Sequence, residues 1–256
     1  MQVGLIGAGN MARALARGWR DPVLCSDGGS GRAAELVAEL GGEALSNREV
    51  AERADCVILC HKPYQLDQVA REIGQHTRTV ASVLGGVNTA TLQASYPDAQ
   101  VFVLIPNTPV EVRQGVILYA ERGSDAPVDP EVEARVLELF GRVGAVVRMP
   151  EAMMRPAAAL SSVGPAYQAL LVEAQVDAAV RRGLKSALAG ELMVQTLSGS
   201  AALLAARGYD TLMVRREVTS PGGSTARGLA ELERGGVRTA FQLAMDAVIG
   251  NKDQRR

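Results

Sequence analysis

The residues best suited to chemistry lie near the C-terminus, in the stretch Val218-Thr219-Ser220-Pro221-Gly222-Gly223-Ser224-Thr225. This stretch leads into an amphipathic helical pattern over 226–234, which Gly235-Gly236 closes. The unpaired N–H groups of a helix start favour a carboxylate or phosphate, and glycines let a ligand approach the backbone. The same residues also fit an ordinary capped helix after a turn, so local physics leaves both interpretations open.

A glycine turn near the N-terminus indicates a second site. Residues 2–6 form a short apolar run, Gly7-Ala8-Gly9-Asn10-Met11-Ala12 follows, and 13–19 has helical spacing. Strand, glycine turn and helix in this order are typical of dinucleotide binding, with Ala12 at the third glycine position. Gly7 permits the tight turn, and Gly9 lets the backbone approach a pyrophosphate at the helix N-terminus. The alternative is a turn that binds no phosphate.

The end of the second predicted strand bears on the choice of cofactor. Residues 23–26 form that strand and Asp27 follows, 20 residues after Gly7, where an acid binds the adenosine ribose of NAD. Ser26, Ser30 and Arg32 are instead suited to the 2′-phosphate of NADP. The two signals conflict, so the residues alone leave NADPH and NADH open.

The elements that position these residues belong to an α/β protein. Apolar runs over 55–60, 79–84 and 100–105 predict buried parallel strands, and weaker candidates lie at 116–119 and 145–149. The three stronger strands end in His61-Lys62-Pro63, Gly85-Gly86 and Pro106-Asn107-Thr108-Pro109. Because open α/β sheets bind ligands at the carboxyl ends of their strands, we expect these segments to line a site.

After Pro150 the pattern becomes purely helical. Residues 165–182 and 186–207 are rich in Ala, Leu and Val and leave little room for a polar face, which is typical of helices buried in a core or a subunit interface. We therefore predict a doubly wound Rossmann domain over 1–153 and an all-α dimerisation domain over 154–256.

Composition excludes several other classes of protein. The chain has 256 residues, 47% apolar and 21% charged, and its net charge of −1 argues against a nucleic-acid partner. Its three cysteines and two histidines lack metal-ligand spacing, so no metal is expected and the thiols fit a reducing compartment. We see no leader segment and no apolar run of roughly 18 residues, and expect a cytoplasmic protein with no membrane partner.

Taken together, the motifs resemble those of the pyrroline-5-carboxylate reductases. The resemblance rests on motifs that occur in order across nearly the whole chain: Gly-Leu-Ile-Gly-Ala-Gly-Asn-Met (4–11), His-Lys-Pro (61–63), Ile-Pro-Asn-Thr-Pro-Val (105–110), Gly-Pro-Ala-Tyr (164–167) and Val-Thr-Ser-Pro-Gly-Gly-Ser-Thr (218–225). It implies reduction of the cyclic imine 1-pyrroline-5-carboxylate to L-proline by NADPH or NADH. It also implies a homodimer, often assembled further into rings.

The resemblance also implies which residues bind the ligands. For the cofactor these are Ile6, Gly7, Ala8, Gly9, Asn10, Met11, Ser26, Asn47, Cys60, His61, Lys62 and Pro63, to which the preceding argument adds Asp27 and Arg32. For the substrate they are Ser220, Gly222, Gly223, Ser224 and Thr225, with Glu151 as the nearest match to a further glutamate. We expect the Thr225 hydroxyl to hydrogen-bond the imine nitrogen.

Three positions depart from the family pattern and concern the substrate. Val163 replaces a small or polar residue, Val103 replaces an arginine, and Glu217 stands where an asparagine or aspartate is usual. A reductase of a related cyclic imine fits these changes. A β-hydroxyacid dehydrogenase needs a catalytic lysine that residues 164–182 do not contain, and a non-catalytic dinucleotide-binding protein would not need the loop at Ser220–Thr225.

Overall fold

The computed structural model describes residues 1–121 and 128–250 of the chain. The chain divides into two compact units, Met1–Pro165 and Ala166–Arg256. The domain boundary expected between residues 153 and 154 stays a prediction, because compactness does not show which part folds on its own. The last six residues of the predicted helical domain lie outside the described residues.

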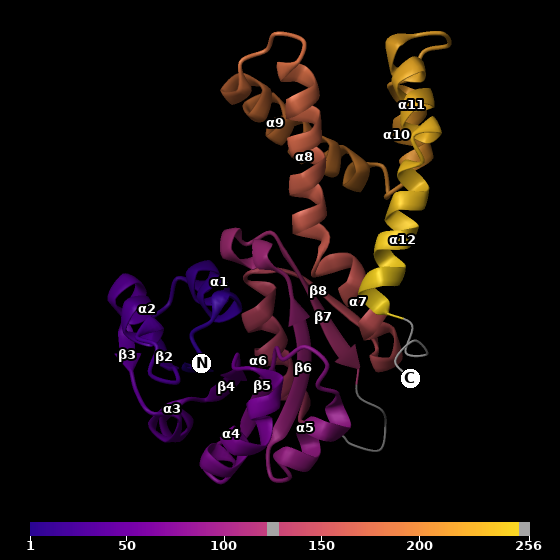
Figure 1. The fold of residues 1–256 in the computed structure, drawn as a ribbon. Coiled ribbons are helices and arrows are strands. Elements are labelled where there is room, and N and C mark those ends of the chain that lie inside the picture. The colour runs from indigo at the N-terminus through magenta and orange to yellow at the C-terminus, as the bar shows by residue number, and fades with distance from the viewer. Residues whose placement is uncertain (122–127, 251–256) are drawn as a thin grey trace. The chain divides into compact units, whose positions relative to one another are not determined.

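The first unit is built on one eight-stranded sheet in the order β3-β2-β1-β4-β5-β6-β7-β8 (Figure 1). All neighbouring strands are parallel except β6 and β7. The strands are β1 Val3–Ile6, β2 Val23–Ser26, β3 Gly42–Ala44, β4 Cys56–Leu59, β5 Thr79–Ser82, β6 Gln100–Pro106, β7 Gly115–Glu121 and β8 Gly144–Pro150. The predicted α/β fold class is therefore confirmed, with one antiparallel pairing and the edge strand β3 in addition.

Helices connect these strands in the first unit. They are α1 Asn10–Trp19, α2 Arg32–Leu40, α3 Asn47–Arg53, α4 Leu66–Ile73, α5 Thr89–Ser95, α6 Pro130–Gly141 and α7 Met154–Ser161, with short 3-10 helices at Pro63–Gln65, Thr108–Val112 and Glu151–Met153. The start of α3 shows how local sequence fixes an element. Ser46 and Glu49 form a capping box, in which each side chain bonds the other residue's backbone N–H.

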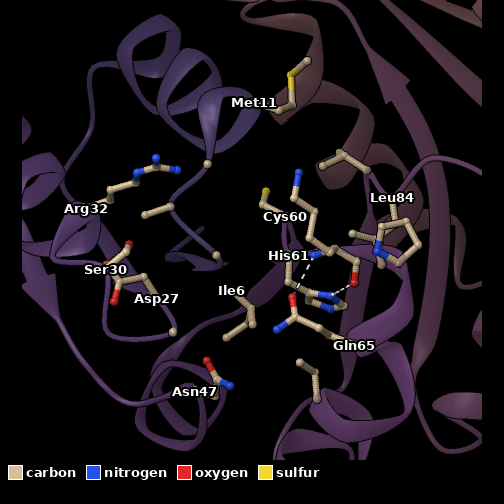
Figure 2. Close-up of a pocket in the computed structure, with 18 of the residues that line it drawn as sticks. Ile6, Met11, Asp27, Ser30, Arg32, Asn47, Cys60, His61, Gln65 and Leu84 are labelled. Carbon is tan, nitrogen blue, oxygen red and sulfur yellow. Dashed lines mark hydrogen bonds between the residues drawn. The ribbon is translucent and has the colours of Figure 1, made fainter.

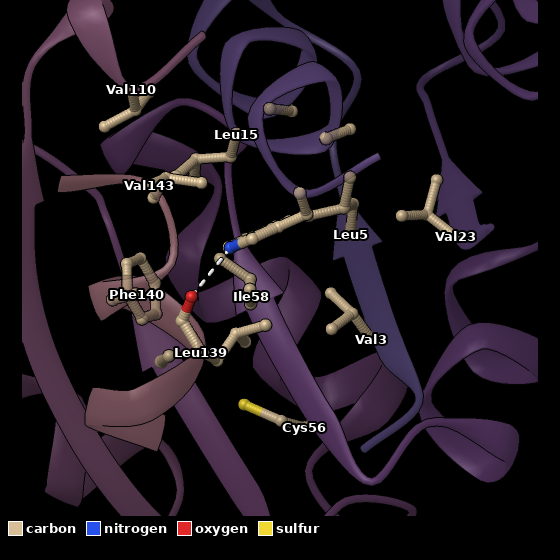
Figure 3. Packing of buried hydrophobic residues seen from close by; sticks show 14 of the residues in the cluster. Val3, Leu5, Leu15, Val23, Cys56, Ile58, Val110, Leu139, Phe140 and Val143 are labelled. Atoms are coloured by element: carbon tan, nitrogen blue, oxygen red, sulfur yellow. Dashed lines mark hydrogen bonds between the residues drawn. The ribbon is translucent and has the colours of Figure 1, made fainter. Parts of the chain in front are cut away.

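Two apolar clusters pack against the sheet and explain why the central strands are apolar throughout. Adjacent strand residues belong to different clusters, as Leu5 and Ile6 do in β1 and Val57 and Ile58 do in β4. In one cluster the buried Trp19 donates from Nε1 to the Leu139 carbonyl at 2.9 Å (Figure 3). Because side chains alternate across a strand, both sheet faces are covered, as in a doubly wound fold.

The second unit is helical. It contains most of α8 Gly164–Val180, which begins at the junction, and then α9 Ser186–Ala206, α10 Thr211–Glu217, α11 Ser224–Arg234 and α12 Val237–Ile249. Leu170, Leu192 and Val194 are more than half exposed, and α8 has no buried residue. The apolar surface expected from the sequence is therefore present in this unit.

One helix of this unit is apolar on average. Among the described residues, α9 is long and apolar enough to cross a membrane by length and composition alone, with a mean hydropathy of 1.2. The average is high because Glu191 is the only charged residue in α9. Gln195, Thr196 and Ser198 interrupt the helix, so it contains no continuous apolar run of the length that we considered in the sequence.

Candidate active site

A cavity of about 620 Å³ lies at the carboxyl ends of β1, β2, β4 and β5. The chain runs from β1 to β2 on one side and later returns to β4 on the other side of β1, and ligands bind at such a switch point. The volume is within the usual range for small-molecule sites. The predicted cofactor residues that line the cavity are Ile6, Gly7, Ala8, Gly9, Asn10, Met11, Asp27, Arg32, Asn47, Cys60, His61, Lys62 and Pro63.

Figure 2 shows how these side chains are distributed. Asp27, Ser30 and Arg32 lie together on one side, whereas Cys60, His61 and Leu84 lie on the other. Sequence reasoning missed a further set of lining residues, namely Gln65, Gln68, Val69, Val83 and Leu84. The available signal was the spacing of Gln65, the N-cap of α4, and of Gln68 and Val69 in its first turn, because residues three and four apart share one helix face.

The two glycines of the turn, Gly7 and Gly9, leave space for different reasons. Gly7 has φ +104°, and a Cβ there would lie 2.8 Å from both the Cys60 carbonyl carbon and the His61 nitrogen. Gly9 has φ −74°, and the nearest atom to a Cβ there is the Cys60 oxygen at 4.0 Å. A side chain at Gly7 would therefore clash with the backbone of the fold itself. At Gly9, the missing side chain leaves space in the cavity at the start of α1.

Asp27 is occupied by its own loop. Its carboxylate accepts hydrogen bonds from the Gly29 N–H at 2.8 Å, the Ala33 N–H at 2.9 Å and the Ser30 hydroxyl at 3.0 Å. These bonds, that of Ala33 first, lower the pKa of Asp27 and keep it ionised. Arg32, the first residue of α2, is exposed beside it and also lines the cavity.

Ser26 does not line the cavity but supports a residue that does. Its hydroxyl donates to Asn47 Oδ1 at 2.6 Å, and Asn47 Nδ2 donates to Glu72 Oε2 at 2.6 Å. Ser26 is buried, whereas Asn47 is half-buried and lines the cavity. The hydroxyls of Ser26 and Ser30, which we expected to receive a 2′-phosphate, therefore already have partners within the protein.

The segment Cys60–Pro63 contributes neutral groups. Burial raises the pKa of the Cys60 thiol and lowers that of the His61 imidazole, whose Nδ1 lies 2.9 Å from the Lys62 carbonyl oxygen. Within the described part of the chain, His61 Nε2 is buried without a hydrogen-bond partner. Neither side chain is a charged nucleophile or acid, and Lys62 supplies the cation on this side of the cavity.

The Ser-Pro-Gly-Gly-Ser-Thr loop belongs to the second unit. Helix α11 starts at Ser224 with Gly223 as its N-cap and no side-chain cap, so its first N–H groups are open to an anion. Gly222 has φ +69°, and Arg227 donates to its carbonyl at 2.7 Å. Ser220, Ser224 and Thr225 are exposed, and Pro221 lies in the turn ahead of the helix. The helix start expected from the sequence is present, and its role in binding a substrate anion stays a prediction.

Glu151 has a partner that sequence reasoning did not find. Its Oε1 accepts from the Thr89 N–H at 2.6 Å and from the Thr89 hydroxyl at 2.7 Å. Glu151 is absent from the residues lining the cavity, and its substrate role stays a prediction.

The segment Pro106–Pro109 does not line this cavity, and its expected place in a site stays a prediction. The buried Asn107 side chain instead donates to the Ser161 carbonyl at 3.1 Å and accepts from the Val116 N–H at 2.8 Å. Both polar atoms of its amide therefore have partners, which link the end of β6 to β7 and to α7. Two of the positions that depart from the family pattern can also be placed. Val103 is buried in β6, and the Glu217 carboxylate accepts a hydrogen bond from Arg207 at 2.9 Å.

The fold and the cavity define a dinucleotide-binding protein of the Rossmann class, and comparison with known proteins narrows this class. The profile "NADP oxidoreductase coenzyme F420-dependent" matches residues 2–86, and "Pyrroline-5-carboxylate reductase dimerisation" matches residues 151–254. A pyrroline-5-carboxylate reductase of Synechocystis is 36% identical over 203 residues, covering 78% of this chain and 75% of the relative. The chain belongs to the pyrroline-5-carboxylate reductase family.

Solved structures agree with this assignment. The 1-pyrroline-5-carboxylate reductase of Streptococcus pyogenes has a TM-score of 0.87 at 28% identity, covering 97% of this chain and 96% of the other. The pyrroline carboxylate reductase of Plasmodium falciparum, solved with NADP bound, has a TM-score of 0.84 at 26% identity, covering 97% and 95%. The likeness thus extends over both units.

Proposed function

We propose that this chain reduces 1-pyrroline-5-carboxylate to L-proline with hydride from NADPH. The proposal rests on one observation: this member of the family has both the cavity at the ends of β1 and β4 and a start of α11 that no side chain caps. The first suits a dinucleotide, and the second suits the carboxylate of the substrate.

The cavity fits a nicotinamide dinucleotide. The start of α1 takes the pyrophosphate, since Gly9 has no side chain to fill that space. Asp27 and Arg32 face the adenosine ribose, so the nicotinamide half extends towards the ends of β4 and β5. Because Ser26 and Ser30 have internal partners, Arg32 is the group that we assign to the 2′-phosphate. NADH stays an alternative through Asp27.

The second unit binds and orients the imine. The N–H groups at the start of α11, around Gly223, Ser224 and Thr225, bind the substrate carboxylate, and Ser220 and Gly222 shape the loop. The N–H of the protonated imine donates to the Thr225 hydroxyl. The cofactor, when bound, supplies the hydride to the imine carbon, a transfer that needs the reacting atoms about 3–3.5 Å apart. The reaction requires no nucleophile, which agrees with the neutral Cys60 and His61.

We also propose a homodimer formed through the helical unit, in a cytoplasmic protein. The chain carries the dimerisation domain of its family. A second copy would bury exposed apolar side chains such as Leu170 and Val194, whose burial stabilises by about 25 cal/mol per Å². The same burial accounts for the apolar composition of α9 without a membrane. Assembly into larger rings remains a prediction from the resemblance.

One assay tests the proposal. Oxidation of NADPH is followed at 340 nm with 1-pyrroline-5-carboxylate, with a related cyclic imine carboxylate, and without an imine. Faster turnover with the first compound supports the proposal. Preference for the related imine would shift the substrate class, as Val163, Val103 and Glu217 suggest. Cofactor binding without turnover on either would favour the non-catalytic alternative.

A further inference from the structure

The contact between Glu151 and Thr89 joins the start of α5 to the segment that follows β8. Both hydrogen bonds end on one carboxylate oxygen, Oε1, and both are short, at 2.6 and 2.7 Å. A charged acceptor makes stronger hydrogen bonds than a neutral one. Glu151 begins the 3-10 helix directly after β8, and β8 pairs with β7 over its whole length, so the anchor is held by the sheet.

The core holds the first residues of the loop from Val83 to Asn88, because the Val83 N–H donates to the Leu59 carbonyl at 3.2 Å and Leu84 is buried. The rest of the loop, from Gly85 onward, has fewer contacts. Gly85 and Gly86 are exposed, with no atom within 4 Å of where a Cβ would lie, and Gly86 has φ +81°. The loop's own bonds are long, with the Leu84 N–H 3.3 Å from Ser82 Oγ and the Val87 N–H 3.4 Å from the Leu84 carbonyl. At its far end, the Asn88 side chain caps α5 by accepting from the Thr91 N–H at 2.7 Å, and the short bonds from Thr89 to Glu151 tie this helix start to the segment after β8.

We propose that Glu151 is a positioning residue of the cofactor cavity. Its carboxylate fixes Thr89 and thereby the preceding loop, whose Val83, Leu84 and Gly85 line the cavity beside the ends of β4 and β5. This inference rests on the proposed function in that the cavity takes NADPH. It gives Glu151 a role in cofactor binding in place of the substrate contact expected from the sequence.

Four single variants of the full-length protein, and the double variant of Glu151→Ala with Thr89→Val, test the proposal. Glu151→Ala removes both bonds, and Glu151→Gln keeps an oxygen that accepts both. Thr89→Val removes only the hydroxyl bond. Glu133→Ala is the matched control, because the Glu133 carboxylate also bonds two groups, Tyr119 and Arg148, but does not line the cavity or touch its loops.

The first readout is the Kd for NADPH, measured by titration without substrate. We expect Glu151→Ala to weaken binding about tenfold and Thr89→Val about threefold, with the double variant no weaker than Glu151→Ala. Glu151→Gln and Glu133→Ala should stay within about twofold of the wild type. An unchanged Kd in Glu151→Ala with a raised KM for the imine would overturn the proposal and make Glu151 a substrate ligand.

The second readout is amide hydrogen exchange of residues 83–95 in the protein without cofactor. Exchange should rise in Glu151→Ala and Thr89→Val and stay as in the wild type in Glu133→Ala. If Glu151→Ala does not fold, Thr89→Val and Glu151→Gln decide by the same two readouts. Unchanged exchange would overturn the proposal even if the protein binds no NADPH, so this failure is distinct from failure of the proposed function.

Discussion

Substitution of Gly9 by valine separates cofactor binding from folding more cleanly than any other change in the glycine turn. Gly9 has φ −74° and ψ −177°, an extended conformation that valine adopts readily. A Cβ there would lie 4.0 Å from the Cys60 oxygen, an ordinary contact. Since Gly9 is the N-cap of α1, valine removes only a modest cap preference, and we expect a loss of about 1 kcal/mol in the free energy of unfolding.

The effect on cofactor binding should be much larger. The valine methyl groups would occupy the space through which the pyrophosphate approaches the start of α1. We expect the Kd for NADPH to rise at least about 100-fold, which corresponds to about 2.7 kcal/mol. The assay is calorimetric titration with NADPH, together with circular dichroism to show that the variant is folded.

Gly7→Ala is the contrasting variant in the same turn. Its φ of +104° and the 2.8 Å approach of a Cβ to two backbone atoms strain the folded state itself. We expect a loss of about 2–4 kcal/mol in stability and a lower Tm. If Gly9→Val lowered the Tm as much as Gly7→Ala, or left the Kd for NADPH unchanged, the assignment of Gly9 to the pyrophosphate would be refuted.

Four further outcomes are expected. Thr225→Ala should lower kcat/KM for the imine roughly 10- to 100-fold with the Kd for NADPH unchanged, and a variant within twofold of wild type would remove Thr225 from the site. Arg32→Ala should weaken NADPH about tenfold and leave NADH unaffected, whereas equal losses would exclude a 2′-phosphate contact. Sedimentation at micromolar concentration should show a dimer, which a folded monomer would contradict. Because the pKa of Asp27 is lowered in the folded state, its contribution to stability is present above its unfolded pKa and is lost as the pH falls towards the lower folded pKa. The free energies of unfolding of the wild type and Asp27→Asn, measured in urea, should therefore converge in acid.

The parts of the fold that the sequence predicted share one property, which is a pattern carried by adjacent residues. β4 was predictable because its four residues are all buried between two helical layers, and α1 because a glycine turn precedes its helical spacing. β3 was not predictable, because its three residues are all exposed and one of them is glycine. Its position depends on pairing with β2, which no local pattern records.

Long-range contacts distinguish two segments at the same edge of the sheet. Asn107 and Gly85 both follow parallel strands, and the sequence gives each the same expectation of lining a site. Gly85 does line the cavity, whereas the Asn107 amide bonds Ser161 and Val116. The difference arises because β7 returns antiparallel beside β6 and brings its backbone to Asn107. The sequence pattern of β6 and β7 does not show whether the two strands pair parallel or antiparallel.

The cofactor question shows how a structure can decide between residues that the sequence treats alike. Ser26, Asp27, Ser30 and Arg32 all lie near the adenosine end, and by type alone three of them suit a 2′-phosphate. In the structure, the Ser30 hydroxyl donates a hydrogen bond to the Asp27 carboxylate, and the Ser26 hydroxyl donates one to Asn47. Asp27→Ala would release the loop as well as remove a charge, so its effect on cofactor choice would be mixed. Arg32 bears its positive charge at the exposed start of α2, and we therefore propose that selectivity for NADPH over NADH depends on this one side chain.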